Sequence, residues 1–145
     1  MSHEHAGHYA AKHAPGTSPN PHIAKLVKQS ASEGRISCAD AHAIVHQLNV
    51  SPAEVGVTID LLEIRVSRCQ LGLFGHGTKK KQISPALDVK PELQAAIEVA
   101  CQNHQLSCIA AWNIAQQLGI SKVEVASACE ALQIKIADCQ LGMFS

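Results

Sequence analysis

The feature that most constrains this chain of 145 residues is an internal repeat with a period of 70 residues. Residues 21–75 align without a gap on residues 91–145, and 17 of the 55 aligned positions are identical. The strongest match joins residues 69–74 (CQLGLF) to residues 139–144 (CQLGMF). A repeat of this length implies one small structural unit formed twice. The sequence therefore predicts four parts: a flexible His-rich tail (1–20), repeat one (21–75), a basic linker (76–90) and repeat two (91–145).

The size of each repeat limits how it can fold. A unit of about 55 residues buries only about 60% of the surface that its unfolded chain exposes, so it is marginally stable alone. Hydrophobic residues make up 46% of the chain but aromatic residues only 3%, so the core must be aliphatic. We therefore expect the two repeats to pack on each other or on a second chain.

Three helices are expected in each repeat. Asn20 before Pro21 is a favourable N-cap and first-turn pair, and the second copy also opens with a proline. Gly34 is expected to end this first helix. The second helix is expected to end at Asn49 in one copy and at Gly119 in the other, because these two residue types best tolerate the left-handed conformation.

The third helix carries the clearest start signal. Ser51, Pro52 and Glu54 provide an N-cap, a first-turn proline and a capping box, and Ser121 with Glu124 repeats the box.

Short strands complete each repeat. Residues 64–68 and 134–138 alternate apolar and polar side chains as strands do, and residues 35–37 and 105–107 are plausible partners. The predicted fold class is mainly α with short β-strands, formed as two tandem units of three helices and a small β element.

The second and third helices resemble a helix-turn-helix motif within a winged helix. In residues 113–125, Ala115 lies where the two helices cross, Gly119 lies in the turn, and Ile120 and Val125 are the apolar residues that follow. Repeat one fits less closely, with Val45, Asn49, Val50 and Val55 at those places. The chain therefore resembles tandem winged-helix proteins, and the resemblance implies DNA binding, with the third helix in the major groove and the wing on phosphates.

The charges agree only partly with DNA binding. The net charge is zero, and repeat two has two lysines against five acidic residues, a net of −3, although DNA attraction depends on basic side chains. Positive charge gathers in the linker and on the expected wing of repeat one. The candidate DNA-contacting residues are Arg65, Arg68, Lys79, Lys80, Lys81, Lys122 and Ser127.

The third helix of repeat one suggests a different use. Its side away from the core is expected to hold Ala53, Gly56, Val57, Asp60 and Leu61 rather than side chains that read bases. Exposed apolar residues on a helix usually pack on something. We therefore predict that Val57 and Leu61 form a protein interface with the other repeat, a second subunit or an unrelated protein.

The histidines of the tail are candidate metal ligands. Clustered imidazoles bind Zn, Ni or Cu, so His3, His5 and His8 can form a weak divalent-metal site. No cofactor is otherwise expected.

The repeated block of residues 69–74 and 139–144 is interpreted as packing at the end of its own repeat. Gly72 and Gly142 are expected to bend the chain, and Phe74 and Phe144 to fill the core. A redox or metal role for the cysteines is the alternative interpretation. The six cysteines form no C-x-x-C pair and are expected to be reduced thiols.

Several functional classes are not supported by the sequence. We find no catalytic motif and expect no enzyme. No apolar run approaches the ~18 residues of a membrane span, and no secretory signal is recognised, so a cytoplasmic protein without membrane contact is expected. The leading prediction is a DNA-associated transcription-regulator-like protein. The alternative is a protein-interaction or oligomerisation module without DNA readout, with a metal or redox response as a variant.

Overall fold

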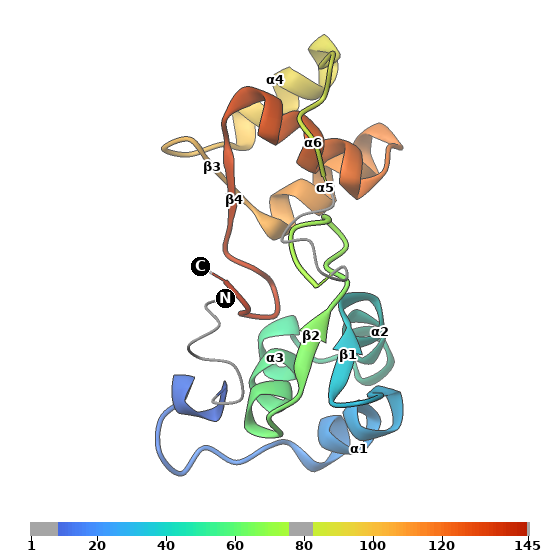
Figure 1. Cartoon of the computed structure of the whole chain (residues 1–145), viewed down its shortest axis with the longest axis vertical. Helices are drawn as coiled ribbons and strands as arrows, with labels where there is room; N and C mark the ends of the chain where they lie inside the picture. Colours follow the sequence, from blue (N-terminus) through green and yellow to red (C-terminus); the bar gives the residue numbers. More distant parts are fainter. Residues whose placement is uncertain (1–8, 76–82, 145) are drawn as a thin grey trace. The chain divides into compact units, whose positions relative to one another are not determined.

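The computed structural model describes residues 9–75 and 83–144 and is mainly α-helical with short strands, as the sequence predicts (Figure 1). The described residues divide into two compact units. Unit one is formed by the chain up to Cys69 together with Gln140–Phe144, and unit two by Gln70–Cys139. These boundaries differ from those of the sequence repeats, because each unit takes up the segment that follows the strand of the other repeat.

Unit one follows the expected order of elements after a short 3₁₀ helix. Its elements are η2 (Tyr9–Lys12), α1 (Pro21–Ser30), β1 (Arg35–Ser37), α2 (Cys38–Leu48), α3 (Pro52–Leu61) and β2 (Arg65–Ser67).

Unit two repeats this order from its first α-helix. Its elements are α4 (Pro91–Ala100), β3 (Gln105–Ser107), α5 (Cys108–Leu118), α6 (Lys122–Leu132) and β4 (Lys135–Ala137).

The helix ends form largely as the sequence predicts. The Asn20 side chain caps α1 by accepting hydrogen bonds from the backbone N–H groups of His22 and Ile23. The capping box of Ser51 and Glu54 is complete at the start of α3. Gly34 does not end α1, because the helix stops at Ser30 and Gly34 instead forms the turn before β1 with a φ of 75°.

The second helices end as predicted, at Asn49 in one copy and at Gly119 in the other. Asn49 has a φ of 53° after α2, and Gly119 has a φ of 65° after α5. Both lie in the left-handed region that these residue types tolerate best.

The strands pair in parallel within each unit. Ile36 lies opposite Val66 in the β1–β2 pair, and Leu106 lies opposite Ile136 in the β3–β4 pair. Two helices separate the paired strands along the chain, as a parallel pair requires a crossover connection. Arg65 therefore lies on a strand whose partner is parallel, and not on a β-hairpin wing.

The core of each unit is aliphatic, as the composition requires. Ile23, Val27 and Ile59 are fully buried in unit one, and Ile97 and Val125 are fully buried in unit two. Val27 and Ile97 are equivalent positions of the two copies, so the repeat places an aliphatic core residue at the same point of each unit.

The repeated Cys-Gln-Leu-Gly block differs from its predicted role. Leu71 and Leu141 are buried, whereas Phe74 and Phe144 are only half-buried, so the leucines and not the phenylalanines fill the interior. Gly72 and Gly142 do bend the chain, with φ values of 76° and 79°. The block also completes the unit formed by the other repeat rather than its own.

Candidate binding surfaces

The third helix of unit one is largely covered, which corrects the expectation that its outer side is open. Gly56 is buried, and a side chain at this position would meet the backbone of Leu141. Asp60 is only 2% exposed, and Val57 and Leu61 are half-buried. The face around Gly56 and Asp60 is therefore buried within unit one.

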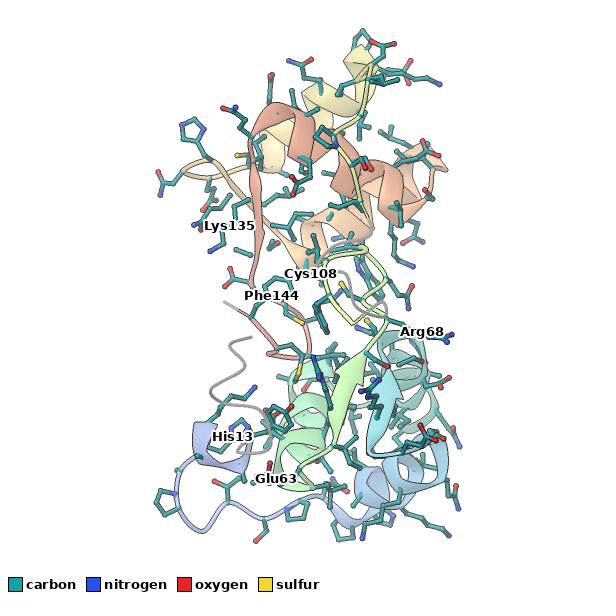
Figure 2. All side chains as sticks on the ribbon, in the orientation of Figure 1. His13, Glu63, Arg68, Cys108, Lys135 and Phe144 are labelled. Atoms are coloured by element: carbon teal, nitrogen blue, oxygen red, sulfur yellow. The ribbon has the colours of Figure 1, made fainter. Side chains whose placement is uncertain are left out.

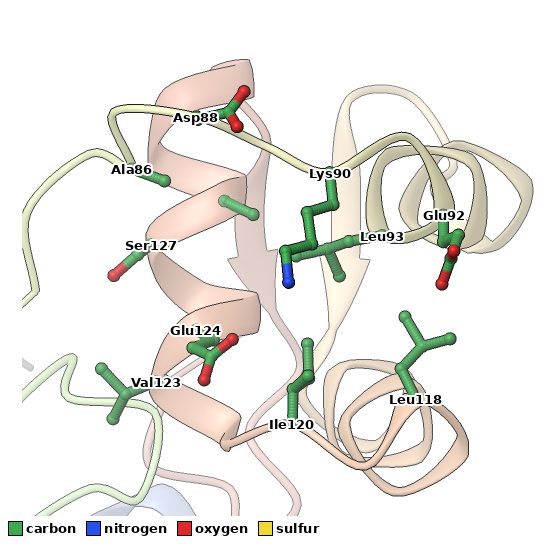
Figure 3. A pocket seen from close by; sticks show the side chains of 11 residues that line it. Ala86, Asp88, Lys90, Glu92, Leu93, Leu118, Ile120, Val123, Glu124 and Ser127 are labelled. Carbon is green, nitrogen blue, oxygen red and sulfur yellow. The ribbon is translucent and has the colours of Figure 1, made fainter.

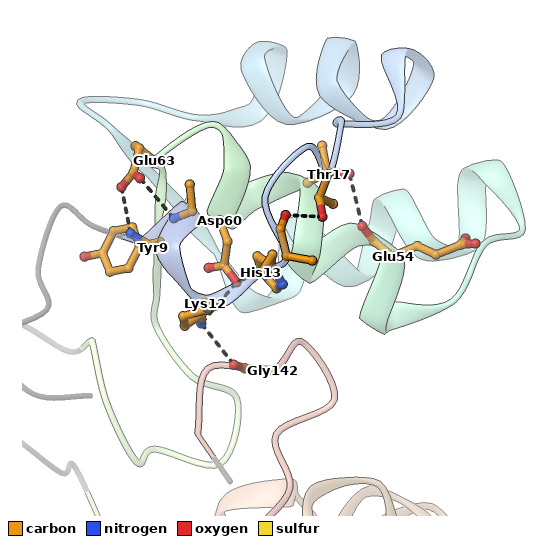
Figure 4. Close-up of polar contacts among 11 residues, drawn as sticks. Tyr9, Lys12, His13, Thr17, Glu54, Asp60, Glu63 and Gly142 are labelled. Atoms are coloured by element: carbon orange, nitrogen blue, oxygen red, sulfur yellow. Dashed lines mark hydrogen bonds and ion pairs between the residues drawn. The ribbon is translucent and has the colours of Figure 1, made fainter.

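The start of the described chain packs on this helix, so residues 9–13 differ from the flexible tail that the sequence suggests (Figure 4). The Glu63 carboxylate accepts hydrogen bonds from the backbone N–H groups of Tyr9 at 2.8 Å and Ala10 at 3.0 Å. Asp60 Oδ2 lies 3.0 Å from Lys12 Nζ and 2.8 Å from His13 Nε2. The buried Asp60 carboxylate is thus matched by basic groups from η2 and the residue that follows it.

Segment Gln140–Phe144 packs on α3 at Gly56. Lys12 Nζ donates a hydrogen bond to the backbone oxygen of Gly142 at 3.2 Å, and Leu141 is 2% exposed. Lys12 therefore contacts both the buried carboxylate of α3 and the segment that covers the helix.

The predicted base-reading residues of unit two also make contacts within their unit. Lys122 Nζ donates to Gln70 Oε1 at 3.0 Å and lies 4.3 Å from the centroid of the Trp112 ring. The backbone oxygen of Ser127 accepts a hydrogen bond from the N–H of Ala86 at 3.0 Å. The amine of Lys122 is therefore held by an amide and an aromatic face, and Ser127 lies beneath the chain that precedes α4.

Three exposed arginines lie on or next to the strand pair of unit one. Arg35 lies directly opposite Arg65 in the parallel strand pair, and Arg68 follows just beyond β2 (Figure 2). All three side chains are exposed, and none makes an ion pair with another described residue. The corresponding residues of unit two are Gln105, Lys135 and Asp138, so this basic surface is not repeated.

A hollow of about 290 Å³ lies beside α6 in unit two (Figure 3). Its floor is apolar, with Leu93, Ile120 and Ala128, and the side chains of Lys90 and Glu124 are directed toward it. Ser127 also lines this hollow. The mixture of one amine with several carboxylates at an exposed rim gives it no single ligand preference.

A second hollow, which we call the α4–α5 groove, has a volume of about 400 Å³ and no charged residue in its lining. The lining residues are Ala95, Ala96, Val99, Ala100, Ala110, Asn113, Ile114 and Gln117. Val99 is 88% exposed, and Ile109 on the neighbouring turn of α5 is 53% exposed. The sequence contains a signal for this surface, because Val99 replaces the polar Gln29 of repeat one.

The remaining candidates of the sequence analysis are thiols, histidines and lysines. None of the six cysteines, all of which are described residues, forms a disulfide. Burial together with nearby Cys101 and Glu130 raises the pKa of Cys129 to about 12. Over residues 9–75 and 83–144, no cluster of His, Cys, Asp or Glu is suited to hold a metal ion. The predicted metal ligands His3, His5 and His8 and the linker residues Lys79, Lys80 and Lys81 lie outside the described residues.

Comparison with known proteins gives no relative from which a role can be transferred. No family model, no curated protein and no solved structure matches the chain. In the part of the chain that the structure describes, none of the helices has both the length and the apolar character that a membrane crossing needs. The surfaces of the two units are therefore the basis on which a function can be argued.

Proposed function

We propose that this protein is a non-enzymatic protein-interaction module that binds its partner through the α4–α5 groove. The observation that carries the proposal is Val99, which is 88% exposed at the edge of an uncharged groove. Exposed apolar surface beside a groove marks sites where another protein packs.

The lining of the groove favours an apolar helix face as the bound element. Four alanines leave the backbones of α4 and α5 accessible, and Ile114 is almost fully buried at 4% exposure. Amphipathic helices bind in such grooves by laying apolar side chains one turn apart into them. Asn113 and Gln117 can hydrogen-bond the polar edge of such a helix.

Comparison of the two repeats supports a role specific to unit two. The equivalent positions of repeat one include Lys25, Gln29 and Asp40, where unit two has Ala95, Val99 and Ala110. Charged side chains at these places oppose apolar packing, because their desolvation is costly. The apolar groove is therefore a property of one copy and not of the repeat as such.

A substitution at Val99 tests the proposal. Val99→Asp places a charge in the groove and is expected to reduce recovery of cross-linked partner from extracts of the source cells by about tenfold or more, as quantitative mass spectrometry measures. Gln29→Asp is the matched control at the equivalent position of unit one. Equal recovery with wild type and Val99→Asp would remove the groove as the binding surface.

A second candidate function is sequence-independent contact with nucleic acid in the cytoplasm, as part of a transcription-regulator-like role. It is favoured by Arg35, Arg65 and Arg68, which are exposed without ion-pair partners among the described residues. Arginines of this kind bind phosphate oxygens and give no base readout. The hypothesis of base reading through Lys122 and Ser127 has less support, since the amine of Lys122 already makes contacts within unit two.

The salt dependence of DNA binding tests this second candidate. In fluorescence-anisotropy titrations with duplex DNA, replacing Arg65 and Arg68 by glutamine is expected to reduce the slope of log K against log salt by about 2. An absence of binding by wild type at low salt would exclude it.

A further inference from the structure

The contact between segment Gln140–Phe144 and α3 is a peptide-binding interaction built into unit one. The segment follows β4, which belongs to unit two, yet it is part of unit one. Leu141 and Met143 are 2% and 8% exposed, and the backbone of Leu141 lies against Gly56. We call the surface of α3 around Gly56, with Lys12 at its edge, the α3 seat.

The α3 seat recognises backbone and side chain together. A Cβ atom at residue 56 would meet the carbonyl oxygen of Leu141, so only glycine permits this approach. Lys12 Nζ donates to the carbonyl oxygen of Gly142, the residue that turns the segment with a φ of 79°. These contacts require a Leu-Gly-Met segment that bends at Gly142, and they make no use of the chain that connects it to β4.

The seat is specific to unit one. The residue equivalent to Gly56 in α6 is Ala126, which carries the Cβ atom that would meet the Leu141 carbonyl if it were present at residue 56. The close approach at Gly56 therefore cannot be reproduced there without a shift of the segment. Segment Gln70–Phe74 meets α6 through a different contact, the hydrogen bond from Lys122 Nζ to Gln70 Oε1.

We propose that the α3 seat also binds segment Gln140–Phe144 of a second copy of this chain. Unit one is linked to its own segment only through unit two, so a segment from another molecule can make the same contacts. Exchange of identical elements between copies is a low-cost route to oligomers, because no new interface has to be formed. Asp138 lies just before the segment with a φ of 54°, and a hinge residue in the left-handed region favours such exchange.

Two complementary full-length variants test the exchange. Leu141→Asp keeps the seat but makes the segment unable to bind, and Gly56→Val blocks the seat but keeps the segment. Each variant alone is expected to be a monomer by size-exclusion chromatography with light scattering. Their mixture is expected to contain a 1:1 complex of twice the monomer mass, and a mixture that remains monomeric overturns the proposal.

Controls separate this contact from other association. The double variant Gly56→Val/Leu141→Asp lacks both the seat and the segment, so it is expected to pair with neither single variant. The complex is expected to persist when both partners also carry Val99→Asp, because the α4–α5 groove takes no part in it. A complex that is lost with Val99→Asp would assign the association to the groove instead.

A second measurement covers the case in which a variant loses its helical circular dichroism spectrum. Wild-type chains labelled with donor or acceptor dyes are mixed near the midpoint of urea unfolding and returned to native buffer. Energy transfer is expected, and excess peptide of residues 139–145 is expected to abolish it. An absence of transfer, or transfer that the peptide leaves unchanged, contradicts exchange through the seat.

Discussion

At the scale of single residues, the most informative positions are those where the two repeats differ at equivalent places. Gly56 and Ala126 are both buried in their third helices, and Gly56 lies so close to the backbone of Leu141 that a Cβ atom would not fit there. Asp60 is 2% exposed and is matched by Lys12 and His13, which have no counterparts in the repeat pattern. Substituting one of two equivalent residues therefore shows whether its effect on stability comes from helix propensity or from a tertiary contact that the other copy lacks.

Gly56→Ala is expected to destabilise the protein, although alanine has a higher helix propensity than glycine. Within a helix, alanine is favoured over glycine by about 1 kcal/mol, but here the added Cβ meets the Leu141 carbonyl. We expect the free energy of unfolding in urea to fall by about 1–3 kcal/mol, as for other overpacked sites. A gain in stability would show that Leu141 does not pack on this helix in solution.

Cys129 is expected to be the least reactive thiol that the structure describes in detail. Burial raises its pKa to about 12, so in the folded protein at pH 8 the thiol stays protonated and cannot attack an alkylating reagent. An unfolded cysteine titrates near about 8.5, so the free energy of unfolding is expected to fall as the pH rises from that value toward 12. Cysteine alkylation followed by peptide mapping measures the first effect.

The half-buried Cys139 is the internal comparison for this experiment. Cys129 is expected to be modified only after denaturant is added. Modification of native Cys129 as fast as Cys139 would contradict its burial.

At the scale of elements, local signals predict the helices and strands well. The structure confirms the predicted starts of α1 and α3 and the bounds of the strand at residues 35–37. These features are predictable because capping residues and the period of apolar side chains depend on only a few neighbouring positions. The prediction that Gly34 ends the first helix is wrong. A glycine can either end a helix or form the turn before a strand, and the neighbouring residues do not distinguish these two roles.

The starts of α1 and α4 provide a matched pair for a stability test. Asn20 caps α1 through its side chain, whereas Lys90 makes no side-chain cap hydrogen bond at the same position of α4. Asn20→Ala is expected to lower the free energy of unfolding by about 1 kcal/mol, and Lys90→Ala to change it much less. Equal losses in thermal and urea denaturation would contradict the capping role of Asn20.

At the scale of the whole molecule, the candidate sites were less predictable than the elements. The cover of α3 comes from residues 9–13 and 140–144, which are distant from it in sequence, and no local pattern reports such contacts. The compact units differ from the sequence repeats in the segment that follows each strand, because equal sequence does not say which unit a segment completes. Val57 and Leu61 appeared exposed for the same reason, since their cover lies outside their own repeat.

The boundaries of the units predict which fragment folds. A fragment of residues 70–139 contains all of unit two, whereas a fragment cut by sequence at 91–145 lacks Gln70, the partner of Lys122, and carries a segment of unit one. The first is expected to unfold cooperatively at higher urea concentration, because more of its buried surface is present. If the 91–145 fragment were more stable, the folding unit would instead be the one that the sequence repeat defines.

The central prediction is that the third helices, which make contacts within their own units, do not read DNA. A nuclear magnetic resonance titration of the isotope-labelled full chain with duplex DNA at low salt tests it most directly. The expected result is that amide signals of α3 and α6 do not move, and that any shifts are confined to the surface around Arg35, Arg65 and Arg68. Saturable shifts of Lys122 and Ser127 with added DNA would contradict the prediction.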